Sequence, residues 1–277
     1  MADHRQEAAF VTGESKVIAV LGWPTAHLRT PTFFNVMCAS RGFKAVMIPW
    51  AVRPDDLESA WEGLRHIQNL AGLVVAIPHK RSAALLCDEL DSDASTLNVV
   101  NAVRRNNDGS FTGRIYDGVA FVEGMLQAGI VLAEKKVLIL GAGGAASAIA
   151  LAIARQGVAA LTIANRGVGK AHNLLELVQR ESVGPRYQVG EAVAAGHDVI
   201  INATSLGMND LDPLPCDLST IDERTVVADL IMQPPMTRLL SLAEERGART
   251  HRGDRMVSTQ LELFVDFLIP TAITTGV

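Results

Sequence analysis

The sequence lacks a cluster of basic residues and a long apolar run, and we expect no secretory signal. Its Lys and Arg residues are scattered and its formal net charge is −5, so it carries no electrostatic footprint for nucleic acid or an anionic membrane. The most apolar stretch, residues 145–154, is too short to span a bilayer, and the polar residues 1–16 contain no apolar signal core. We therefore expect a cytoplasmic protein that binds a small molecule, with neither nucleic acid nor a membrane as partner.

A cysteine framework is also missing. Cys38, Cys87 and Cys216 are odd in number, widely spaced and without a Cys-x-x-Cys pair. This pattern argues against a disulfide frame and against a zinc site, and it fits a reducing compartment. We expect no metal, and we expect each cysteine to be a small buried apolar residue.

The first half of the chain alternates strand-like and helix-like segments. Its 277 residues exceed the usual size of one core, and 48% hydrophobic residues suffice for two ordinary cores. Asn106 to Gly109 favour a tight hairpin, which predicts a mixed sheet. We expect strands at 17–21, 45–50, 73–77, 98–104 and 110–113, and helices at 31–41, 54–68, from Pro78 to about Leu90, and 118–128.

The second half predicts a doubly wound parallel sheet, because strand-like and helical segments alternate there. A domain boundary is expected within the helical segment 117–129. A final helix at 256–268 carries apolar residues at helical spacing, and it could fold back onto the first domain. The expected strands of the second half are 137–140, 161–164, 199–202 and 226–230.

A glycine-rich turn opens this second half. Gly141, Ala142, Gly143, Gly144 and Ala145 follow a predicted strand and begin a helix of small residues. Glycine lets the backbone turn sharply and approach a pyrophosphate, whose charge the helix amides then receive. The motif in this context predicts dinucleotide binding.

The end of the next strand favours NADP over NAD. An acidic residue there would bond the ribose diol of NAD, but the chain has Asn165 followed by Arg166, with Lys170 four residues further on. Two cations near a helix start suit the extra phosphate of NADP. Both could instead be solvated surface charges, so NAD stays possible.

Lys80 and Asp117 are the candidate proton-handling residues. Each stands where a predicted strand gives way to a helix, the end at which ligands gather in open α/β sheets. Alone, either could be a helix-terminal charge, and Asp117 could simply cap its helix. Beside a dinucleotide turn they predict hydride transfer to a ketone or from an alcohol, with the pair handling the proton on the oxygen.

Short motifs recur in one order over residues 17–267, and together they resemble the shikimate dehydrogenase family. Any single motif would be unspecific, whereas the whole series is highly specific. The motifs are Gly22-Trp23-Pro24 with His27, Pro31 and Asn35; Ile77-Pro78-His79-Lys80; Val100-Asn101; Asp117-Gly118; the glycine turn; Asn202-Ala203-Thr204-Ser205-Leu206-Gly207-Met208; Asp229 with Pro234 and Thr237; and Gly253 with Met256 and Gln260.

The resemblance implies the reversible reduction of 3-dehydroshikimate, or a related cyclic keto acid, to shikimate with NADP. It implies a substrate-binding catalytic domain at 1–118 plus 254–277, and a Rossmann-type dinucleotide-binding domain at 119–253 that faces it across a cleft. Lys80 and Asp117 would be catalytic, while Asn101 and Gln260 would contact the ring hydroxyls. Further cofactor positions would be Thr204, Gly207, Met208, Leu230 and Gly253, and the protein would be a monomer or a homodimer.

The sequence departs from the family at the substrate. Leu28 and Thr30 stand where the family has two serines that hold the substrate carboxylate, Ala76 replaces a threonine, and Met232 replaces a tyrosine. The apolar Val74 and Ile115, together with Tyr116, replace further polar residues of the family. Each lost charge-assisted hydrogen bond weakens binding by roughly 1.5–3 kcal/mol.

Two explanations of these departures stay open. Either Arg29 or Arg114 replaces the lost carboxylate contacts, or the substrate is another ring, such as quinate or a less acidic cyclic ketone. Two alternatives to the expected function also remain. One is a quinate/shikimate dehydrogenase that uses NAD, and the other is a catalytically silent NADP-binding sensor.

Overall fold

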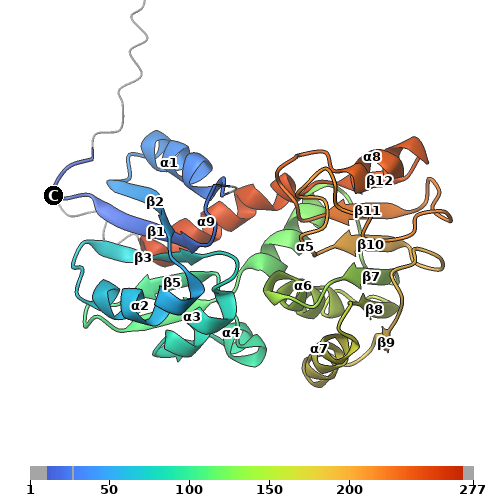
Figure 1. Ribbon diagram of the computed structural model, residues 1–277, viewed down its shortest axis with the longest axis horizontal. Coiled ribbons are helices and arrows are strands. Elements are labelled where there is room, and N and C mark those ends of the chain that lie inside the picture. The colour runs from blue at the N-terminus through green and yellow to red at the C-terminus, as the bar shows by residue number, and fades with distance from the viewer. Residues whose placement is uncertain (1–10, 27, 271–277) are drawn as a thin grey trace, which may run out of the picture. The chain divides into compact units, whose positions relative to one another are not determined.

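The computed structural model describes residues 11–26 and 28–270, and these residues pack into two compact units (Figure 1). Among the described residues, the first unit contains 11–114 and 261–270, and the second contains 115–260. Asp117 and Gln260 therefore both belong to the second unit. His27, which the sequence placed in a substrate loop, lies outside the described residues.

The first unit is built on a mixed six-stranded sheet, as the hairpin signal predicted. Its strand order is β2-β1-β3-β5-β6-β4. The first three strands run parallel, and β5 is antiparallel to both β3 and β6. The strands are β1 (Lys16–Gly22), β2 (Ala45–Ala51), β3 (Leu70–Val75), β4 (Glu89–Leu90), β5 (Ala102–Arg105) and β6 (Phe111–Arg114).

The helices of the first unit enclose an aromatic core. Trp61 is 2% exposed and meets Phe111 edge-on, with ring centroids 5.0 Å apart. Trp61 is thus a core residue, whereas Trp23 is 44% exposed. The helical segments are α1 (Thr30–Ser40), η1 (Pro54–Asp56), α2 (Leu57–Arg65), α3 (Lys80–Leu86) and α4 (Ser92–Leu97), and α9 (Val257–Leu268) ends in this unit.

The strand expected at 73–77 was misplaced, because β3 covers Leu70–Val75. The apolar run continues into Ile77, but that side chain is 59% exposed, so hydrophobicity alone put the end too late. Gly72 made the start of this strand hard to recognise in the sequence. A Cβ on Gly72 would lie 2.3 Å from the Val103 carbonyl oxygen, so the glycine marks close strand pairing and does not interrupt the strand.

Three other bounds were also wrong. The helix expected from Pro78 to about Leu90 is the shorter α3, and the helix expected at 54–68 divides into η1 and α2. The strand expected at 98–104 begins only at Ala102, because Asn98 ends α4 in the left-handed conformation, with φ 49°. Helix α4 itself was missed, although the Asp91 carboxylate caps it by accepting from the Ala94 amide at 2.8 Å.

The second unit contains a parallel six-stranded sheet in the order β12-β11-β10-β7-β8-β9. This is the doubly wound order of dinucleotide-binding folds, which confirms the expected fold class. The four predicted strands are present, and β9 and β12 are additional. The strands are β7 (Lys136–Leu140), β8 (Ala160–Ala164), β9 (Arg186–Val189), β10 (Val199–Asn202), β11 (Val226–Asp229) and β12 (Arg249–His251).

Small residues allow the helices of the second unit to pack closely. A Cβ on Gly118 would lie 2.2 Å from the Ala148 carbonyl oxygen, so α5 requires glycine where it meets α6. A separate apolar cluster, which includes Ile200, Val227 and Leu240, packs one part of this unit. The helical segments are α5 (Asp117–Gln127), α6 (Gly144–Ala154), α7 (Val168–Glu181), α8 (Arg238–Glu245) and η2 (Gly253–Met256).

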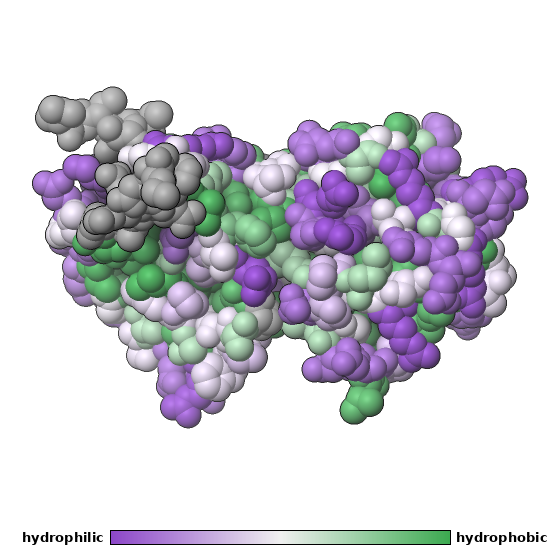
Figure 2. All heavy atoms as spheres, turned by 90° about the horizontal axis from the view of Figure 1, so that it is seen from above, coloured by the Kyte–Doolittle hydropathy of each residue, from purple (hydrophilic) through white to green (hydrophobic). Residues whose placement is uncertain are grey.

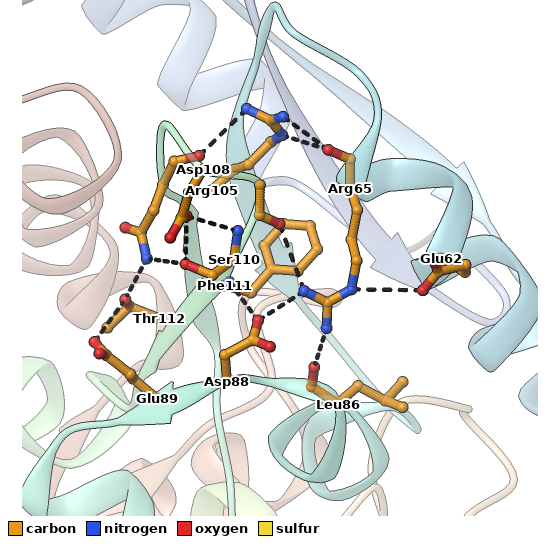
Figure 3. Close-up of polar contacts among 12 residues, drawn as sticks. Glu62, Arg65, Leu86, Asp88, Glu89, Arg105, Asp108, Ser110, Phe111 and Thr112 are labelled. Carbon is orange, nitrogen blue, oxygen red and sulfur yellow. Dashed lines mark hydrogen bonds and ion pairs between the residues drawn. The ribbon is translucent and has the colours of Figure 1, made fainter.

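A charged network fastens the hairpin of the first unit (Figure 3). Arg65 Nη1 donates to Asp88 Oδ2 at 2.7 Å, and the same carboxylate oxygen accepts from the Phe111 amide at 2.7 Å. Arg105 in turn donates to the Arg65 carbonyl oxygen. The Arg65 guanidinium lowers the pKa of the Asp88 carboxyl and joins the end of α2 to the hairpin.

Hydrophilic side chains predominate on the face of the second unit that Figure 2 shows, with hydrophobic ones scattered between them. Within the part of the chain that the structure describes, each helix is too short or too polar to cross a bilayer.

Candidate active site

The turn after β7 approaches the loop after β10 so closely that only glycine fits. Gly141 has φ +111°, and its amide donates to the Ala164 carbonyl oxygen at 2.8 Å. A Cβ on Gly141 would lie 2.9 Å from the Ala203 carbonyl oxygen. The turn therefore brings the ends of β7, β8 and β10 together, where a dinucleotide binds in this class of sheet.

The space above Gly143 is open. Among residues 11–26 and 28–270, no heavy atom beyond the glycine and its chain neighbours lies within 4 Å of a Cβ built there, and no side chain caps the start of α6. Ser147, which is buried, donates from Oγ back to the Gly143 carbonyl oxygen at 2.9 Å. Gly144 and Ala145 form the first turn of α6, so their amides lie at the positive end of the helix and fit a pyrophosphate.

The residues after β8 carry positive charge and no acid. Asn165 is half-buried, and its Nδ2 donates to the Gly167 carbonyl oxygen at 3.0 Å, which shapes the turn. Arg166 and Lys170 are exposed, and neither is ion-paired with any residue within 11–26 or 28–270. The donor set fits the extra phosphate of NADP.

A buried side-chain network holds the loop after β10. Asn202, which ends β10 and is 0% exposed, accepts on Oδ1 from the Thr204 amide at 3.1 Å and hydroxyl at 2.7 Å. Its Nδ2 donates to the Leu206 carbonyl oxygen at 3.0 Å. Gly207 has φ +106°, and its amide donates to Asp212 Oδ2, which lowers the pKa of that carboxyl. Met208 follows in the same loop and is half-buried.

Asp229, at the end of β11, joins that loop to the next one. Its carboxylate is 0% exposed and accepts from Asn202 Nδ2 at 3.1 Å, the Ile231 amide at 3.0 Å and the Thr237 hydroxyl at 2.7 Å. Burial raises the pKa of the Asp229 carboxyl. Thr237 also caps α8, because its hydroxyl accepts from the Leu240 amide.

Leu230 and Gly253 are brought together, although they are far apart in sequence. A Cβ on Gly253 would lie 2.5 Å from the Leu230 carbonyl oxygen, so only glycine permits this approach. Met232 lies two residues beyond Leu230 and is half-buried. These three predicted positions thus lie around one loop of the second unit.

Asp117 begins α5 and is 4% exposed. Gln260 Nε2 donates to Asp117 Oδ1 at 2.9 Å, so the amide fixes the orientation of the carboxylate. The residue that precedes α5 is Tyr116, and its side chain makes no capping hydrogen bond. Gln260 was expected to contact the substrate ring, and the structure adds a contact with the candidate catalytic carboxylate.

Lys80 and Asn101 are neighbours in the first unit. Lys80 is the first residue of α3 and is half-buried, and its carbonyl oxygen accepts from the Val100 amide at 3.0 Å. Asn101 is 2% exposed, and its backbone links β3 to β6 through the Val75 amide and the Arg114 carbonyl oxygen. Lys80 lies at the strand-to-helix junction after β3, as the sequence predicted, and Asn101 lies beside the carboxyl end of β3.

Leu28, Thr30 and Ala76 lie near the carboxyl ends of β1 and β3. Leu28 Cδ1 and the Ala76 Cβ both approach Gly22, at 3.2 and 3.4 Å from the position of a Cβ built there. Leu28, Thr30 and Ala76 are all half-buried, and Thr30 is the first residue of α1. This part of the candidate substrate wall is therefore largely apolar.

The described histidines near these residues serve the fold. His79 is 1% exposed, and its Nε2 lies 2.7 Å from the Val52 carbonyl oxygen. Burial lowers the pKa of His251 to about 4, and Phe121 meets its ring edge-on. Within 11–26 and 28–270, no group of His, Cys, Asp and Glu is arranged to hold a metal ion.

The cysteines carry no reactive thiolate. Cys38, Cys87 and Cys216 are free thiols, and burial raises the pKa of Cys38 to about 11 and those of Cys87 and Cys216 to about 12. These values keep all three protonated at neutral pH.

Two features of the site were missed from the sequence. Asn202 and Asp229 were noted only as family markers, yet they form the network that shapes both loops around the candidate cofactor site. The contact between Gln260 and Asp117 was also not foreseen. A signal for the network did exist, because polar residues that end buried parallel strands meet at one edge of the sheet.

Comparison with protein families gives two matches. Residues 20–103 match the shikimate dehydrogenase substrate binding domain, and residues 125–209 match the shikimate / quinate 5-dehydrogenase family. A shikimate dehydrogenase (NADP(+)) of Geobacter metallireducens is 34% identical over 260 residues, which cover 91% of this chain and 90% of the relative.

Solved structures also match this chain over most of its length. A shikimate dehydrogenase in complex with NADP+ superimposes with a TM-score of 0.86 at 28% identity, and the match covers 94% of this chain and 92% of that one. A ligand-free 5-ketofructose reductase of Gluconobacter sp. strain CHM43 superimposes with a TM-score of 0.80 at 29% identity, covering 94% of this chain and 96% of that one.

Proposed function

The chain belongs to the shikimate dehydrogenase family, and on that premise we propose that it is an NADP-dependent oxidoreductase that reversibly reduces a ring ketone to an alcohol. Family membership supports 3-dehydroshikimate, or a related cyclic keto acid, as the first substrate to test. Biosynthesis of aromatic compounds is the corresponding role. Three free cysteines are consistent with a reducing, cytoplasmic location.

One observation carries the proposal. The second unit combines a buried carboxylate, Asp117, held at 2.9 Å by Gln260, with a glycine turn that fits a pyrophosphate. A buried carboxylate that accepts a hydrogen bond from a fixed amide keeps one orientation, as proton exchange with a bound alcohol requires.

The reaction assigns a role to each retained polar residue. NADPH supplies the hydride to the ketone carbon when it is bound, and the ketone oxygen must then receive a proton. In this proposal Lys80 donates a hydrogen bond to that oxygen, and Asp117 takes up and returns the proton. Asn101 and Gln260 bind neighbouring hydroxyl groups of the substrate.

The cofactor is held by the second unit. Gly141 to Ala145 receive the pyrophosphate, and Asn165, Arg166 and Lys170 receive the adenosine end with its extra phosphate. The loop from Thr204 to Met208, together with Leu230 and Gly253, borders the nicotinamide. Replacing Arg166 by Ala should weaken NADP binding about tenfold and leave NAD binding unchanged, since one charge-assisted contact is lost. Arg180→Ala, at an exposed arginine of α7, is the control.

Substitution of Lys80 tests the assignment. Lys80→Ala should lower kcat about 100-fold or more while the Kd for NADP stays within about twofold, because general acid-base groups typically contribute that much to rate. Asp117→Asn should act in the same way. Lys44→Ala, a change at an exposed lysine of the same unit, should leave both values unchanged. Near-normal turnover by Lys80→Ala with the true substrate would sink the assignment.

A substrate panel separates the alternatives. Shikimate, quinate, 3-dehydroshikimate, 5-ketofructose and a keto-inositol should be assayed with each cofactor by nicotinamide absorbance. The panel includes 5-ketofructose because a structural neighbour is a 5-ketofructose reductase. A preference for quinate with NAD would favour the quinate/shikimate dehydrogenase. Tight NADP binding without turnover on any member would favour the silent sensor.

A further inference from the structure

An apolar surface replaces polar groups at the edge of the first sheet where a ligand would lie. Gly22 ends β1, and Ala76 directly follows β3, its parallel neighbour. Leu28 Cδ1 closes over these ends, 3.2 Å from the position of a Cβ on Gly22, and the Ala76 Cβ lies 3.4 Å from the same point. Carboxyl ends of parallel strands are the usual ligand-binding edge, so Leu28 and Ala76 occupy the wall that a substrate faces.

A carboxylate on this wall would lose its water without gaining donors. Neither Leu28 nor Ala76 has a side-chain hydrogen-bonding group, and Val74, also in this region, is 5% exposed and apolar. A charged group that leaves water needs a paired charge or several hydrogen bonds in return, whereas an uncharged hydroxymethyl or ring carbon does not.

Arg114 and Arg29 could supply that compensation, but each has another environment in this structure. The Arg114 guanidinium lies 4.5 Å from the centroid of the Phe267 ring, and its Nε is 3.8 Å from Asp91 Oδ2. It is thus already engaged with an aromatic face and a carboxylate. Arg29 is exposed and precedes the first residue of α1, so its charge is hydrated.

The polar residues that the first unit retains can form hydrogen bonds with hydroxyl groups of a ligand. Asn101 is 2% exposed and offers both a donor and an acceptor, and Thr30 has one hydroxyl. Lys80 serves the reacting oxygen in the proposed function. These groups can hydrogen-bond to a polyhydroxylated molecule, whereas Leu28 and Ala76 offer no partner to a charged group.

We propose that the natural substrate is an uncharged polyhydroxy ketone, such as a keto sugar or a ketocyclitol, and that Leu28 and Ala76 select against a carboxylate. This rests on the proposed oxidoreductase function and changes only the charge of the substrate. The ketone carbon gains the hydride of NADPH, the oxygen gains a proton, and NADP+ is the oxidised product. The alcohol formed is uncharged as well.

The first test compares rates for the full chain with NADPH. We expect kcat/KM for 5-ketofructose or the keto-inositol to exceed that for 3-dehydroshikimate at least 100-fold. Equal or better turnover of 3-dehydroshikimate overturns this inference and leaves the oxidoreductase function standing. Absence of turnover on every panel member overturns both.

The second test restores donors to the wall. Leu28→Ser combined with Ala76→Thr should raise kcat/KM for 3-dehydroshikimate at least tenfold, chiefly by lowering KM, and should lower kcat/KM for the uncharged ketone. Leu85→Ser, at a leucine of α3 that is 73% exposed, is the matched control and should change neither value. A circular dichroism spectrum and a urea unfolding midpoint that match those of the parent show that the first unit of the double variant is folded, and an unchanged NADP affinity shows the same for the second. A folded double variant without the gain removes Leu28 and Ala76 as the selecting residues.

Discussion

The two units of the chain differ in how they use polar side chains. In the second unit, the polar residues at the ends of β10 and β11 are fully buried, and they bond one another and the loops that follow. In the first unit, the side-chain network of Arg65 and Asp88 lies at the rim of the hairpin, with 26% and 40% of these side chains exposed. The second unit thus places its polar network at the binding edge of the sheet, and the first places its network away from that edge.

This difference indicates in which unit a substitution can alter ligand recognition. Loops that border a dinucleotide must keep one geometry to bind it, and a buried hydrogen-bond network fixes that geometry. At the ligand edge of the first unit, Leu28 and Ala76 each approach Gly22 with an apolar side chain. Substitution there alters recognition without disturbing a hydrogen-bond network.

The largest expected effect comes from the buried carboxylate of the second unit. Asp229→Ala should destabilise that unit by about 3–5 kcal/mol, because Asn202, Ile231 and Thr237 each lose the acceptor of a buried donor. Urea unfolding measures the loss. Hydrogen exchange should show reduced protection in β10 and β11 and unchanged protection in β1 and β3.

Asp210→Ala, at an exposed aspartate of the same unit, is the control and should leave unfolding unchanged. Thr237→Ser keeps the hydroxyl that donates to Asp229 and should cost far less than Thr237→Val. An unaltered urea midpoint for Asp229→Ala would show that the network is not what stabilises these loops.

A second pair of variants probes the glycine turn of the same unit. Gly141→Ala should cost about 2–4 kcal/mol, because alanine at φ +111° is strained and its Cβ would meet the Ala203 carbonyl oxygen at 2.9 Å. Gly143→Ala should fold normally, since nothing lies within 4 Å of its Cβ. It should nevertheless weaken NADP binding, measured by fluorescence titration, if the pyrophosphate approaches there. Equal stability of the two variants would contradict the role assigned to Gly141.

Histidine 251 makes the second unit sensitive to acid. Burial lowers the folded-state pKa of His251 to about 4 from the model-peptide value of 6.5, so the unfolded chain binds the proton more tightly. The contribution of neutral His251 to the free energy of unfolding is therefore fully present above about pH 6.5. It is lost as the pH falls toward 4, by roughly 2–3 kcal/mol in all.

Urea unfolding at pH 7 and at pH 4.5 checks this prediction. His251→Phe should reduce the difference between the two pH values, because it removes the group that titrates. His66→Gln, at a histidine whose side chain is 79% exposed, should leave that difference as it is. The same acid sensitivity in His251→Phe as in the parent would exclude His251 as its cause.

The sequence predicted the second unit more accurately than the first, for a physical reason. Strands buried on both faces are continuous apolar runs, so β7, β8, β10 and β11 were found from hydrophobicity alone. Strand β9 was missed, because it lies at the edge of the sheet and its residues are exposed or half-buried. In the first unit, Gly72 obscured the start of β3 because its role depends on a partner strand distant in sequence.

The candidate site could be read from the sequence only residue by residue. Asp117 and Lys80 were marked by their place at strand-to-helix junctions, and the glycine turn by its spacing. The hydrogen bond from Gln260 to Asp117 spans 143 residues of chain, so no local pattern could reveal it. The same holds for Leu28 and Ala76, whose shared contact with Gly22 turns two separate departures into one apolar surface.

The smallest expected effect concerns the charged network of the first unit. Arg65→Met should cost about 1 kcal/mol, because partly exposed ion pairs contribute little even where, as here, Asp88 also accepts from the Phe111 amide. The effect should shrink at high salt, which screens exposed charges. Lys44→Met, at a lysine whose side chain is 71% exposed and which pairs with Glu14, should produce no measurable change. Urea unfolding of these variants beside Asp229→Ala decides the comparison. If Arg65→Met costs as much as Asp229→Ala, then the rim network in Figure 3 stabilises its unit as strongly as the buried one, and burial does not distinguish the two units.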